Sequence, residues 1–341
     1  MDRDIEVLRR VGIDVIDLLR DEHRANPENH FIAARYGARL LEKGEIKSGI
    51  SLFQRRLLFE DPSGNQYDHY QILVDDLNPE LSLELLGKTL IIDCRQNGFG
   101  DIIFFSRVVP HLAKCASSLL LVVPLQLYSL LSFFELDLHC KLLTAVPDDL
   151  ASLDSLSCLR VDIISAALAL WAHDDSSLFS VNVKSTLPFF TAKPRQACLF
   201  PFAAEKFRRL LNLNLEDDLS RRSMTKNEIK TFKQLPTVQH YSELAVFGHH
   251  SDYSPWWDEP ESPKITQFPN DFLELAKIIS EFSPVFAVDS AVFHLCGLLG
   301  IDTTLILPRV PDWRYGNPYI SLDGNVRWYK NAKVFPSRLP L

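Results

Sequence analysis

The spacing of apolar residues divides the chain into a helical first part and a longer part of short apolar runs. Near the start, apolar residues follow a helical period, and acidic and arginine side chains fill the opposite face. These apolar residues are Leu8, Val11, Val15, Leu18 and Leu19. The pattern predicts a helix over residues 3–22, then a pair of helices between Glu28 and Pro62 with Gly44 in the turn.

The predicted pair of helices approximates one tetratricopeptide (TPR) unit. The matching positions are Ala33, Tyr36, Gly37, Leu40, Gly49, Phe53 and Pro62. Ala33 replaces the usual Trp, Gly49 replaces the usual Ala, and Pro62 falls one place late. An ordinary helical hairpin explains the pattern equally well. A lone repeat cannot bury its apolar face, so this pair must pack on the preceding helix and the following domain.

After a polar joint that contains Pro79, short apolar runs alternate with helical stretches. Strands are expected at residues 88–94, 118–123, 141–144, 161–164, 197–200, 285–288 and 304–307, and Val246-Phe247 is ambiguous. Helices are expected at residues 102–112, 125–134, 224–235, 272–282 and 291–299. This alternation predicts parallel sheets covered by helices on both faces. The two sets, joined near residues 188–194, predict an α/β fold of twin Rossmann-like domains facing a cleft.

The 341 residues are enough for about two domains of ordinary size. We expect three parts: a helical TPR-like segment at 1–80, an N-terminal Rossmann-like domain at 86–190 and a C-terminal one at 194–341. Residues 115–134 carry no charge, but Pro124 divides them into a strand and a short helix. No transmembrane segment is therefore predicted.

Composition narrows the classes of partner and site. A net charge of −8 argues against a nucleic-acid surface, because such surfaces need a basic face. Only a short basic cluster stands out, around Arg222 and Lys226, and it could hold one small anion. The six cysteines form no CxxC pair and lack zinc-finger spacing, so no metal site is predicted and a reducing compartment is indicated. Since no signal peptide is evident, we expect a cytoplasmic location.

The first candidate site follows the first predicted strand and reads Gln96, Asn97, Gly98, Phe99, Gly100, Asp101. We expect Gly98 and Gly100 to let the backbone turn sharply and approach a ligand closely. Asp101 precedes an apolar helix, where its carboxylate either caps that helix or serves as a general base. The GxGxxG dinucleotide fingerprint is absent, which argues against a nucleotide-binding enzyme of another class, such as an epimerase.

The second candidate site lies where a predicted buried strand ends and a helix begins. Asp289 closes the strand, Ser290 and Ala291 open the helix, and His294 follows one turn later. Backbone N–H groups at such a helix start suit a diphosphate. The alternatives are that Asp289 caps the helix and that His294 is a hydrogen-bonded core residue.

The third candidate site follows the last predicted strand. Trp313 and Tyr315 could stack on a base or sugar, and Arg314 offers a planar cationic group. A loop whose aromatic residues pin the C-terminal tail is the alternative.

These motifs resemble those of bacterial TPR-linked glycosyltransferases, related to heptosyltransferases and more distantly to protein O-GlcNAc transferase. The family segment GKTLLxxxEQGxGDxIxFxRYLP is matched by residues 87–92 and 96–101, then by Phe105, Arg107 and Pro110. The segment VDTAxAHLAGALGxP is matched by residues 288–300, and LPxxPDWRW…WYPxxxLF by residues 307–315 and 328–335. Residues 222–224 resemble a shorter RSI/M element. The resemblance covers residues 28–336.

The resemblance implies a GT-B fold and an inverting, metal-independent transfer from a nucleotide-diphosphate sugar, without a cofactor. By this resemblance Asp101 is the acceptor base, and Asp289 orients the donor or its loop. Diphosphate contacts are implied for Ser290, Ala291 and His294. Further donor-binding candidates are Arg222, Lys226, Trp313 and Arg314. The expected partners are a nucleotide-sugar donor and a protein or glycan acceptor, which the helical segment helps to recruit.

One departure from the family concerns the start of the second domain. The family has a strand ending in WxGNP, whose loop contacts donor phosphate, whereas residues 198–205 here lack the Trp and the Gly-Asn pair. Gln96 and Asn97 also stand where the family has Glu-Gln. Either the donor differs, or Arg222 and Lys226 compensate, or activity is lost. The alternative function is therefore a non-catalytic TPR-type adaptor with a decayed transferase domain. The sugar, the base, the acceptor and the oligomeric state, a homo-oligomer included, stay open.

Overall fold

The fold was analysed in a computed structural model that describes residues 13–58, 88–134, 140–147, 158–173, 196–201, 203, 222–239, 241, 244–248, 265–267, 269, 271–308, 311–316 and 318–335. The chain divides into two compact units. Unit 1 comprises Met1–Thr186 and Asp312–Tyr319, and unit 2 comprises Leu187–Pro311 and Ile320–Leu341. The expected boundaries near residues 80–86 and 190–194 lie outside the described residues, so they stay a prediction.

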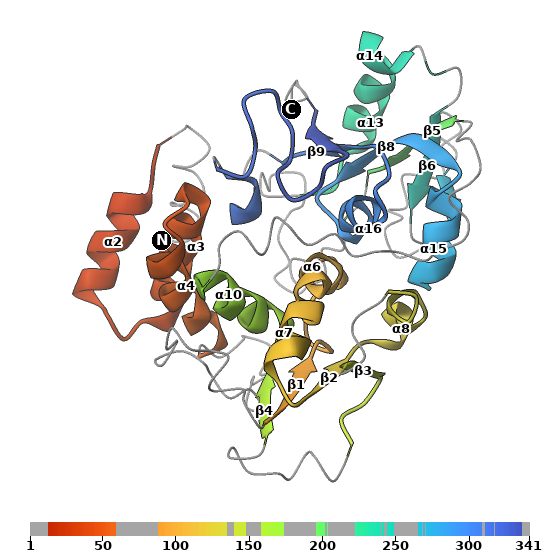
Figure 1. Ribbon diagram of the computed structural model, residues 1–341. Helices are drawn as coiled ribbons and strands as arrows, with labels where there is room; N and C mark the ends of the chain where they lie inside the picture. Colours follow the sequence, from red (N-terminus) through yellow and green to blue (C-terminus); the bar gives the residue numbers. More distant parts are fainter. Residues whose placement is uncertain are drawn as a thin grey trace. The chain divides into compact units, whose positions relative to one another are not determined.

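The described part of unit 1 begins with helices, as the apolar spacing predicts (Figure 1). They are α2 (Ile16–Ala25), α3 (His30–Lys43), α4 (Ile46–Phe53) and the 3-10 helix η1 (Gln54–Leu57). Gly44 ends α3 with φ of 84°, a left-handed conformation that favours glycine, so its place in the turn is confirmed. Residues 3–12 of the first predicted helix lie outside the described residues.

Helices α3 and α4 pack very closely because glycines lie at their contact. A Cβ atom at Gly37 would lie 2.3 Å from the Phe53 nitrogen, and one at Gly49 would lie 2.8 Å from Leu41 Cγ. Such a pair fits both a TPR unit and an ordinary hairpin, and Pro62 lies outside the described residues. The TPR assignment therefore stays a prediction.

The described part of unit 1 contains a four-stranded parallel sheet in the order β3-β2-β1-β4. Its strands are β1 (Thr89–Asp93), β2 (Ser118–Val122), β3 (Cys140–Leu143) and β4 (Cys158–Val161). Its helical elements are α6 (Phe99–Phe105), η2 (Ser106–Val108), α7 (Val109–Cys115), α8 (Leu125–Leu131) and α10 (Ile163–His173). A buried cluster of Ile91, Leu120, Val122 and Cys158 forms part of the core.

Unit 2 contains a six-stranded parallel sheet within its described part, in the order β10-β9-β8-β5-β6-β7. Its strands are β5 (Gln196–Phe200), β6 (Leu244–Gly248), β7 (Ile265–Gln267), β8 (Phe282–Val288), β9 (Thr303–Ile306) and β10 (Ala332–Val334). Its helices are α13 (Lys226–Lys233), α14 (Pro236–Gln239), α15 (Phe272–Ile279) and α16 (Ala291–Leu299). The core includes Leu199, Ile229, Phe232, Phe286 and Val288.

The α/β class with parallel sheets is thus confirmed, while the cleft between two Rossmann-like domains stays a prediction. The strand expected at residues 161–164 was misplaced: β4 ends at Val161, and Ile163 begins α10. The cause is Asp162, whose Oδ1 accepts from Ile164 N at 2.9 Å and from Ser165 N at 3.2 Å and so starts the helix.

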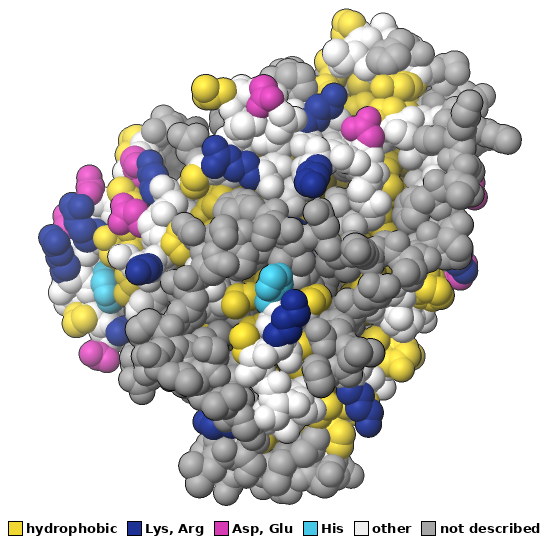
Figure 2. Space-filling view, viewed as in Figure 1, with side chains coloured by type: hydrophobic (Ala, Val, Ile, Leu, Met, Phe, Trp, Pro, Cys, Tyr) yellow, Lys and Arg dark blue, Asp and Glu magenta, His cyan; other side chains and the backbone are white. Residues whose placement is uncertain are grey.

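The uncharged stretch after Cys115 forms β2 and α8 on either side of Pro124, as predicted. None of the helices in the described ranges combines the length and the apolar character needed to cross a membrane. On the face shown in Figure 2, the described Lys and Arg side chains are dispersed among acidic, apolar and neutral groups.

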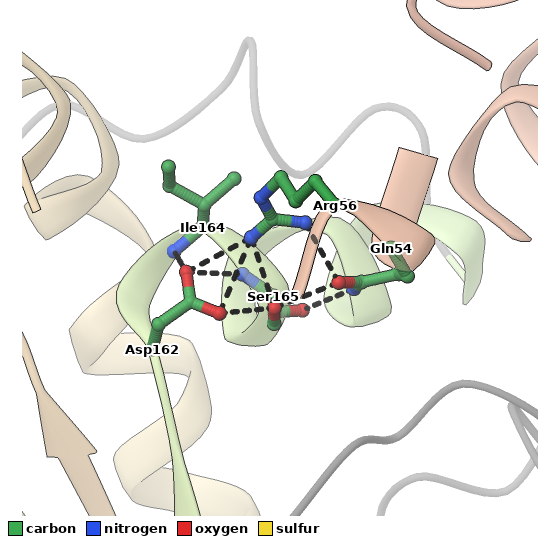
Figure 3. Close-up of polar contacts among 5 residues, drawn as sticks. All are labelled: Gln54, Arg56, Asp162, Ile164 and Ser165. Atoms are coloured by element: carbon green, nitrogen blue, oxygen red, sulfur yellow. Dashed lines mark hydrogen bonds and ion pairs between the residues drawn. The ribbon is translucent and has the colours of Figure 1, made fainter. Parts of the chain in front are cut away.

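A buried polar network joins η1 to the start of α10 (Figure 3). Arg56 Nη2 donates to Asp162 Oδ1 at 3.0 Å and to Ser165 Oγ at 3.1 Å, and Arg56 Nη1 donates to Gln54 Oε1 at 2.9 Å. The Asp162 side chain is 2% exposed and that of Arg56 is 15% exposed. Because a buried carboxylate needs a cation beside it, the network attaches the helical hairpin α3–α4 to the sheet part of unit 1.

Candidate functional site

The first candidate site begins at the carboxyl end of β1, where Asp93 is buried between two arginines. Its Oδ1 accepts from Arg95 Nε at 2.9 Å, and its Oδ2 accepts from Arg95 Nη2 at 2.8 Å and from Arg160 Nη2. Burial alone would raise the pKa of Asp93, but the hydrogen bonds from Arg95 and Arg160 hold that pKa below its usual value. This ion cluster secures the start of the loop that leads to Asp101.

The two glycines of this loop do not serve the sharp turn that the sequence suggested. Gly98 is the N-cap residue of α6 with φ of −65°, and Gly100 lies in the first turn of α6. Neither has a positive φ, so the expectation of a glycine-specific turn was wrong. Instead, a Cβ atom at Gly98 would lie 3.1 Å from Asp101 Oδ2, so the glycine leaves room for that carboxylate.

Asp101 lies in the first turn of α6, so the alternative that it is the N-cap residue was wrong. Its Oδ1 accepts from Arg314 Nη1 at 2.8 Å. The Asp101 side chain is 30% exposed, whereas that of Arg314 is 9% exposed. The carboxylate is therefore partly open to solvent and held in place by a buried guanidinium, and its role as a general base stays a prediction.

Arg314 is itself fixed from two further sides. Its Nε donates to Asp312 Oδ1 at 2.8 Å, and its Cζ lies 5.4 Å from the centroid of the Phe104 ring on α6. Asp312 also caps the 3-10 helix η5 (Trp313–Tyr315) by accepting from Arg314 N at 3.1 Å. Burial alone would raise the pKa of Asp312, but the charge and hydrogen bonds of Arg314 hold that pKa below its usual value.

Trp313 and Tyr315 are buried within unit 1. The Trp313 ring centroid lies 6.0 Å from that of Phe53, 5.9 Å from that of Trp171 and 6.2 Å from that of Tyr319. Phe53 and Trp171 are not part of the C-terminal tail, so these contacts do not test the alternative in which the aromatic residues of the loop pin that tail. A donor-binding role for Trp313 stays a prediction, and its neighbours in the structure lie in unit 1 rather than in the C-terminal sheet.

Gln96 and Asn97 lie in the loop before α6 and differ in exposure. Gln96 is exposed, whereas Asn97 donates its N–H to Cys94 O at 2.9 Å within a turn. The Oδ1 atom of Asn97 is buried, and no donor within the described part of the chain reaches it. An acceptor-side role for Gln96 and Asn97 stays a prediction.

In unit 2, β8 ends just before Asp289, and Ser290 is the N-cap residue of α16. Ser290 does not cap the helix with its side chain, because its Oγ donates to Val288 O at 3.1 Å. The first N–H groups of α16 therefore receive no bond from the N-cap side chain. An anion at this end would be stabilised by those groups and by the helix dipole.

His294 is buried with 2% of its side chain exposed, and its two ring nitrogens face different partners. Nδ1 lies 2.9 Å from the Tyr329 hydroxyl, and Nε2 lies 3.8 Å from Asp289 Oδ1. Asp289 is equally buried, and its Oδ2 lies 3.9 Å from Arg222 Nη1. These are contacts of a hydrogen-bonded core histidine, and a diphosphate contact by His294 stays a prediction.

The segment that carries Arg222 is bound to the end of β5. Ser223 Oγ accepts from Ala203 N at 3.0 Å and donates to Ala203 O at 3.2 Å, and Met224 N donates to Pro201 O at 2.8 Å. Arg222 thus lies near the carboxyl ends of β5 and β8. Lys226 begins α13 by its backbone, and its side chain lies outside the described residues.

The predicted site residues therefore fall into two groups. Asp101, Arg314 and the loop from Gln96 to Gly100 come together in unit 1, although Arg314 was assigned to donor binding in the C-terminal domain. Asp289, Ser290, Ala291, His294 and Arg222 come together in unit 2. Among the described residues, no cluster of three His, Cys, Asp or Glu side chains could hold a metal ion.

Sequence reasoning assigned no role to four residues that shape these groups: Asp93, Phe104, Asp312 and Tyr329. Asp312 lies two positions before Arg314, a spacing typical of a side chain that caps a short helix and also pairs with it. Tyr329 lies in the segment that matches the family pattern WYPxxxLF. That match singles out the segment, but it does not predict the contact between Tyr329 and His294. Phe104 has no local signal, because its role depends on a residue far along the chain.

Comparison with known proteins gives matches only among solved structures. No family model matches the chain, and no curated protein matches it. The solved structures include the glycosyltransferase TibC of enterotoxigenic E. coli, with 11% identity, a TM-score of 0.41, and coverage of 65% of this chain and 58% of TibC. They also include heptosyltransferase WaaC of E. coli, with 11% identity, a TM-score of 0.40, and coverage of 73% and 92%.

A further match is a family 9 glycosyl transferase of Veillonella parvula, with 11% identity, a TM-score of 0.45, and coverage of 73% of this chain and 86% of that one. This chain thus spans less than two thirds of TibC and most of the other two proteins.

Proposed function

We propose that the chain transfers a sugar from a nucleotide-diphosphate donor to a hydroxyl of a protein or glycan. The observation that carries this proposal is the contact between Asp101 and Arg314. These residues are 213 positions apart and belong to two different family-like motifs, yet they meet in one compact unit. The meeting of the two motifs supports the view that they form one site, with an accessible carboxylate at its centre.

The proposed reaction is a direct displacement at the anomeric carbon. Asp101 takes the proton of the acceptor hydroxyl as the acceptor oxygen bonds to that carbon. The bond between the anomeric carbon and the diphosphate oxygen breaks, and its electron pair leaves with the nucleoside diphosphate. Because the acceptor enters opposite the leaving group, the configuration inverts. The steps use no metal, and the negative charge of the leaving group must be stabilised by protein groups.

The groups proposed to stabilise the diphosphate are those of unit 2. The start of α16 offers backbone N–H groups that the side chain of Ser290 does not occupy. Arg222 adds a cation, with 36% of its side chain exposed, beside the buried Asp289. We therefore assign Arg222 the phosphate contact that the family takes from its Gly-Asn loop, with Lys226, Ala291 and His294 as further donor-side candidates.

The helical segment is proposed to recruit the acceptor. The Arg56–Asp162 network attaches the hairpin α3–α4 to the sheet of unit 1. An acceptor bound to the hairpin would therefore be held in a fixed position relative to Asp101. The six cysteines are all free, which favours a reducing compartment and hence a cytoplasmic location.

The test is transfer by the Asp101→Ala variant. A panel of UDP-, GDP- and ADP-sugars would be screened for binding by calorimetry and for transfer by mass spectrometry of protein and oligosaccharide acceptors. We expect Asp101→Ala to lose transfer by roughly 10²–10⁴-fold while keeping donor affinity. Glu281→Ala, which removes an exposed carboxylate between α15 and β8, is the control and should transfer normally. Full transfer by Asp101→Ala would remove Asp101 from the base role.

A second candidate function is a non-catalytic adaptor. It is favoured by the residues after β5, where Pro201 and Ala203 stand in place of a Gly-Asn pair, and by the buried position of His294. An adaptor of this kind would give no heat with any nucleotide sugar in the calorimetric panel. Binding of one donor with a measurable affinity would exclude it in its simplest form.

A further inference from the structure

The guanidinium of Arg314 is more completely fixed than donor binding alone would require. Its Nη1 donates to Asp101, its Nε donates to Asp312, and the plane borders the Phe104 ring. With 9% of its side chain exposed, Arg314 offers little surface to a soluble ligand. Asp101 is the more exposed of the two, with 30% of its side chain accessible. The guanidinium therefore contacts the carboxylate, and the carboxylate contacts the solvent.

We propose that Arg314 is a positioning residue that acts through Asp101, and that it is not a ligand of the donor. This inference rests on the proposed transferase function. Arg314 Nη1 donates to Oδ1, and a Cβ atom at Gly98 would lie only 3.1 Å from Oδ2. The proton of the acceptor hydroxyl is therefore received by Oδ2, in an orientation that the guanidinium sets.

The backbone that carries Arg314 is anchored on the helical hairpin α3–α4. Tyr319 Oη donates to Leu41 O at 2.7 Å, and a Cβ atom at Gly316 would lie 2.4 Å from Glu42 O. Trp313 packs on Phe53, which belongs to α4. The residues from 312 to 319 thus form a brace, which we call the 312–319 brace, between the hairpin and the general base.

The brace gives the helical hairpin a second role besides acceptor recruitment. The neighbours of Arg314 in the chain, Trp313 and Tyr319, contact α4 and α3. The orientation of Asp101 therefore depends on the hairpin being packed against the rest of unit 1. A misplacement of about 1 Å at a reacting group can cost on the order of 10²-fold in rate. The loss expected on removing Arg314 is therefore a loss of rate and not of donor affinity.

The test is a double-mutant cycle with Arg314→Gln, Asp101→Asn and the double variant, with kcat and donor KM measured by transfer from the best donor of the panel. We expect Arg314→Gln to lower kcat by about 10²-fold with donor KM changed less than twofold. The double variant should be no slower than Asp101→Asn, because an arginine that acts only through Asp101 has nothing left to position.

Chemical rescue separates positioning from a merely structural role. In Arg314→Ala, added guanidinium ion should fill the vacated position beside Asp312 and raise the kcat of the variant at least tenfold. It should restore nothing in Asp101→Asn. Lys277→Ala is the control, because it removes a cation that pairs with an exposed carboxylate, Glu274, on α15 of unit 2. That variant should keep kcat, and guanidinium should not accelerate it.

Failure of this inference differs from failure of the proposed function. Absence of turnover by the unaltered chain with every donor overturns the transferase proposal, and the positioning role with it. In an active chain, a raised donor KM at constant kcat would make Arg314 a donor ligand and overturn the positioning role alone. Additive losses in the cycle, or no rescue by guanidinium, would overturn it as well.

Discussion

At the scale of single residues, the space around the Asp101 carboxylate is set by the residue three positions earlier. Gly98 has φ of −65°, which any residue adopts, so its glycine is needed for room and not for conformation. A methyl group at this position would lie 3.1 Å from Asp101 Oδ2, closer than ordinary van der Waals contact. We expect Gly98→Ala to shift the carboxylate by a few tenths of an ångström and to lower kcat by about three- to tenfold.

The measurement for Gly98→Ala is kcat together with the melting temperature of the variant. Stability should be kept, because alanine tolerates the backbone conformation that Gly98 adopts. A matched glycine is Gly37, where a Cβ would lie 2.3 Å from the backbone nitrogen of Phe53, so Gly37→Ala should instead lower the melting temperature. Unchanged kcat in Gly98→Ala would mean that the carboxylate has other room to move.

Asp93 gives a prediction about pH at the same scale. Its pKa is held below the usual value of 3.8 by Arg95 and Arg160 against the opposing effect of burial. A lowered pKa in the folded state means that the ionised carboxylate stabilises the fold above about pH 4. This stabilisation is lost as the pH falls through the lower, folded-state pKa.

We therefore expect Asp93→Asn to be less stable than the unaltered chain at pH 7, and the difference to shrink as the pH falls below about 4. Urea unfolding at a series of pH values measures that difference. Asp17→Asn, an exposed carboxylate on α2, should show little difference at any pH. A stability difference for Asp93→Asn that grows on acidification would contradict the assigned direction of the pKa.

At the scale of elements, one arginine contributes to the attachment of the helical hairpin. Arg56 Nη2 lies 3.0 Å from Oδ1 of the buried Asp162, which also begins α10. We expect Arg56→Met to leave that carboxylate without its cation and to lower the free energy of unfolding by about 3 kcal/mol. Arg24→Met is the control, since Arg24 and Asp21 form an exposed pair at 3.8 Å whose removal should cost less than about 0.5 kcal/mol. Equal losses in the two variants would show that the network contributes no more than a surface pair.

The elements that the sequence predicted well are those in which the apolar residues that form the pattern are the same residues that the fold buries. The run from Leu119 to Val122 is buried on both faces, and the apolar pattern shows this directly. The strand at β4 was placed too late because the pattern does not reveal that Asp162 starts a helix there. Strands β7 and β10 have three residues each, too few for a periodic pattern to show.

At the scale of the whole molecule, what the sequence could not predict is which distant segments meet. The motif around Arg314 follows the last predicted strand of the C-terminal set, so chain order alone assigns it to the donor domain. In the structure it belongs to unit 1, because Trp313 fills a space between Phe53 and Trp171. The candidate residues were identified from the sequence, but the Asp101–Arg314 contact depends on tertiary packing that no local pattern carries.

The assignment of the 312–319 brace to unit 1 leads to a prediction about where a cavity would loosen the chain. Trp313 is 5% exposed, and Trp313→Ala should remove contacts with Phe53, Trp171 and Tyr319 at a cost of about 3–5 kcal/mol. Hydrogen–deuterium exchange read by mass spectrometry should then rise in α3, α4 and α10, the helices around the cavity. Phe232→Ala is the matched control, because Phe232 is buried against Phe286 in unit 2. Its exchange should rise in α13 and β8 instead. If Trp313→Ala raised exchange mainly in β8 and β9, residue 313 would belong with the C-terminal sheet, and the route by which the hairpin holds Arg314 against Asp101 would be lost.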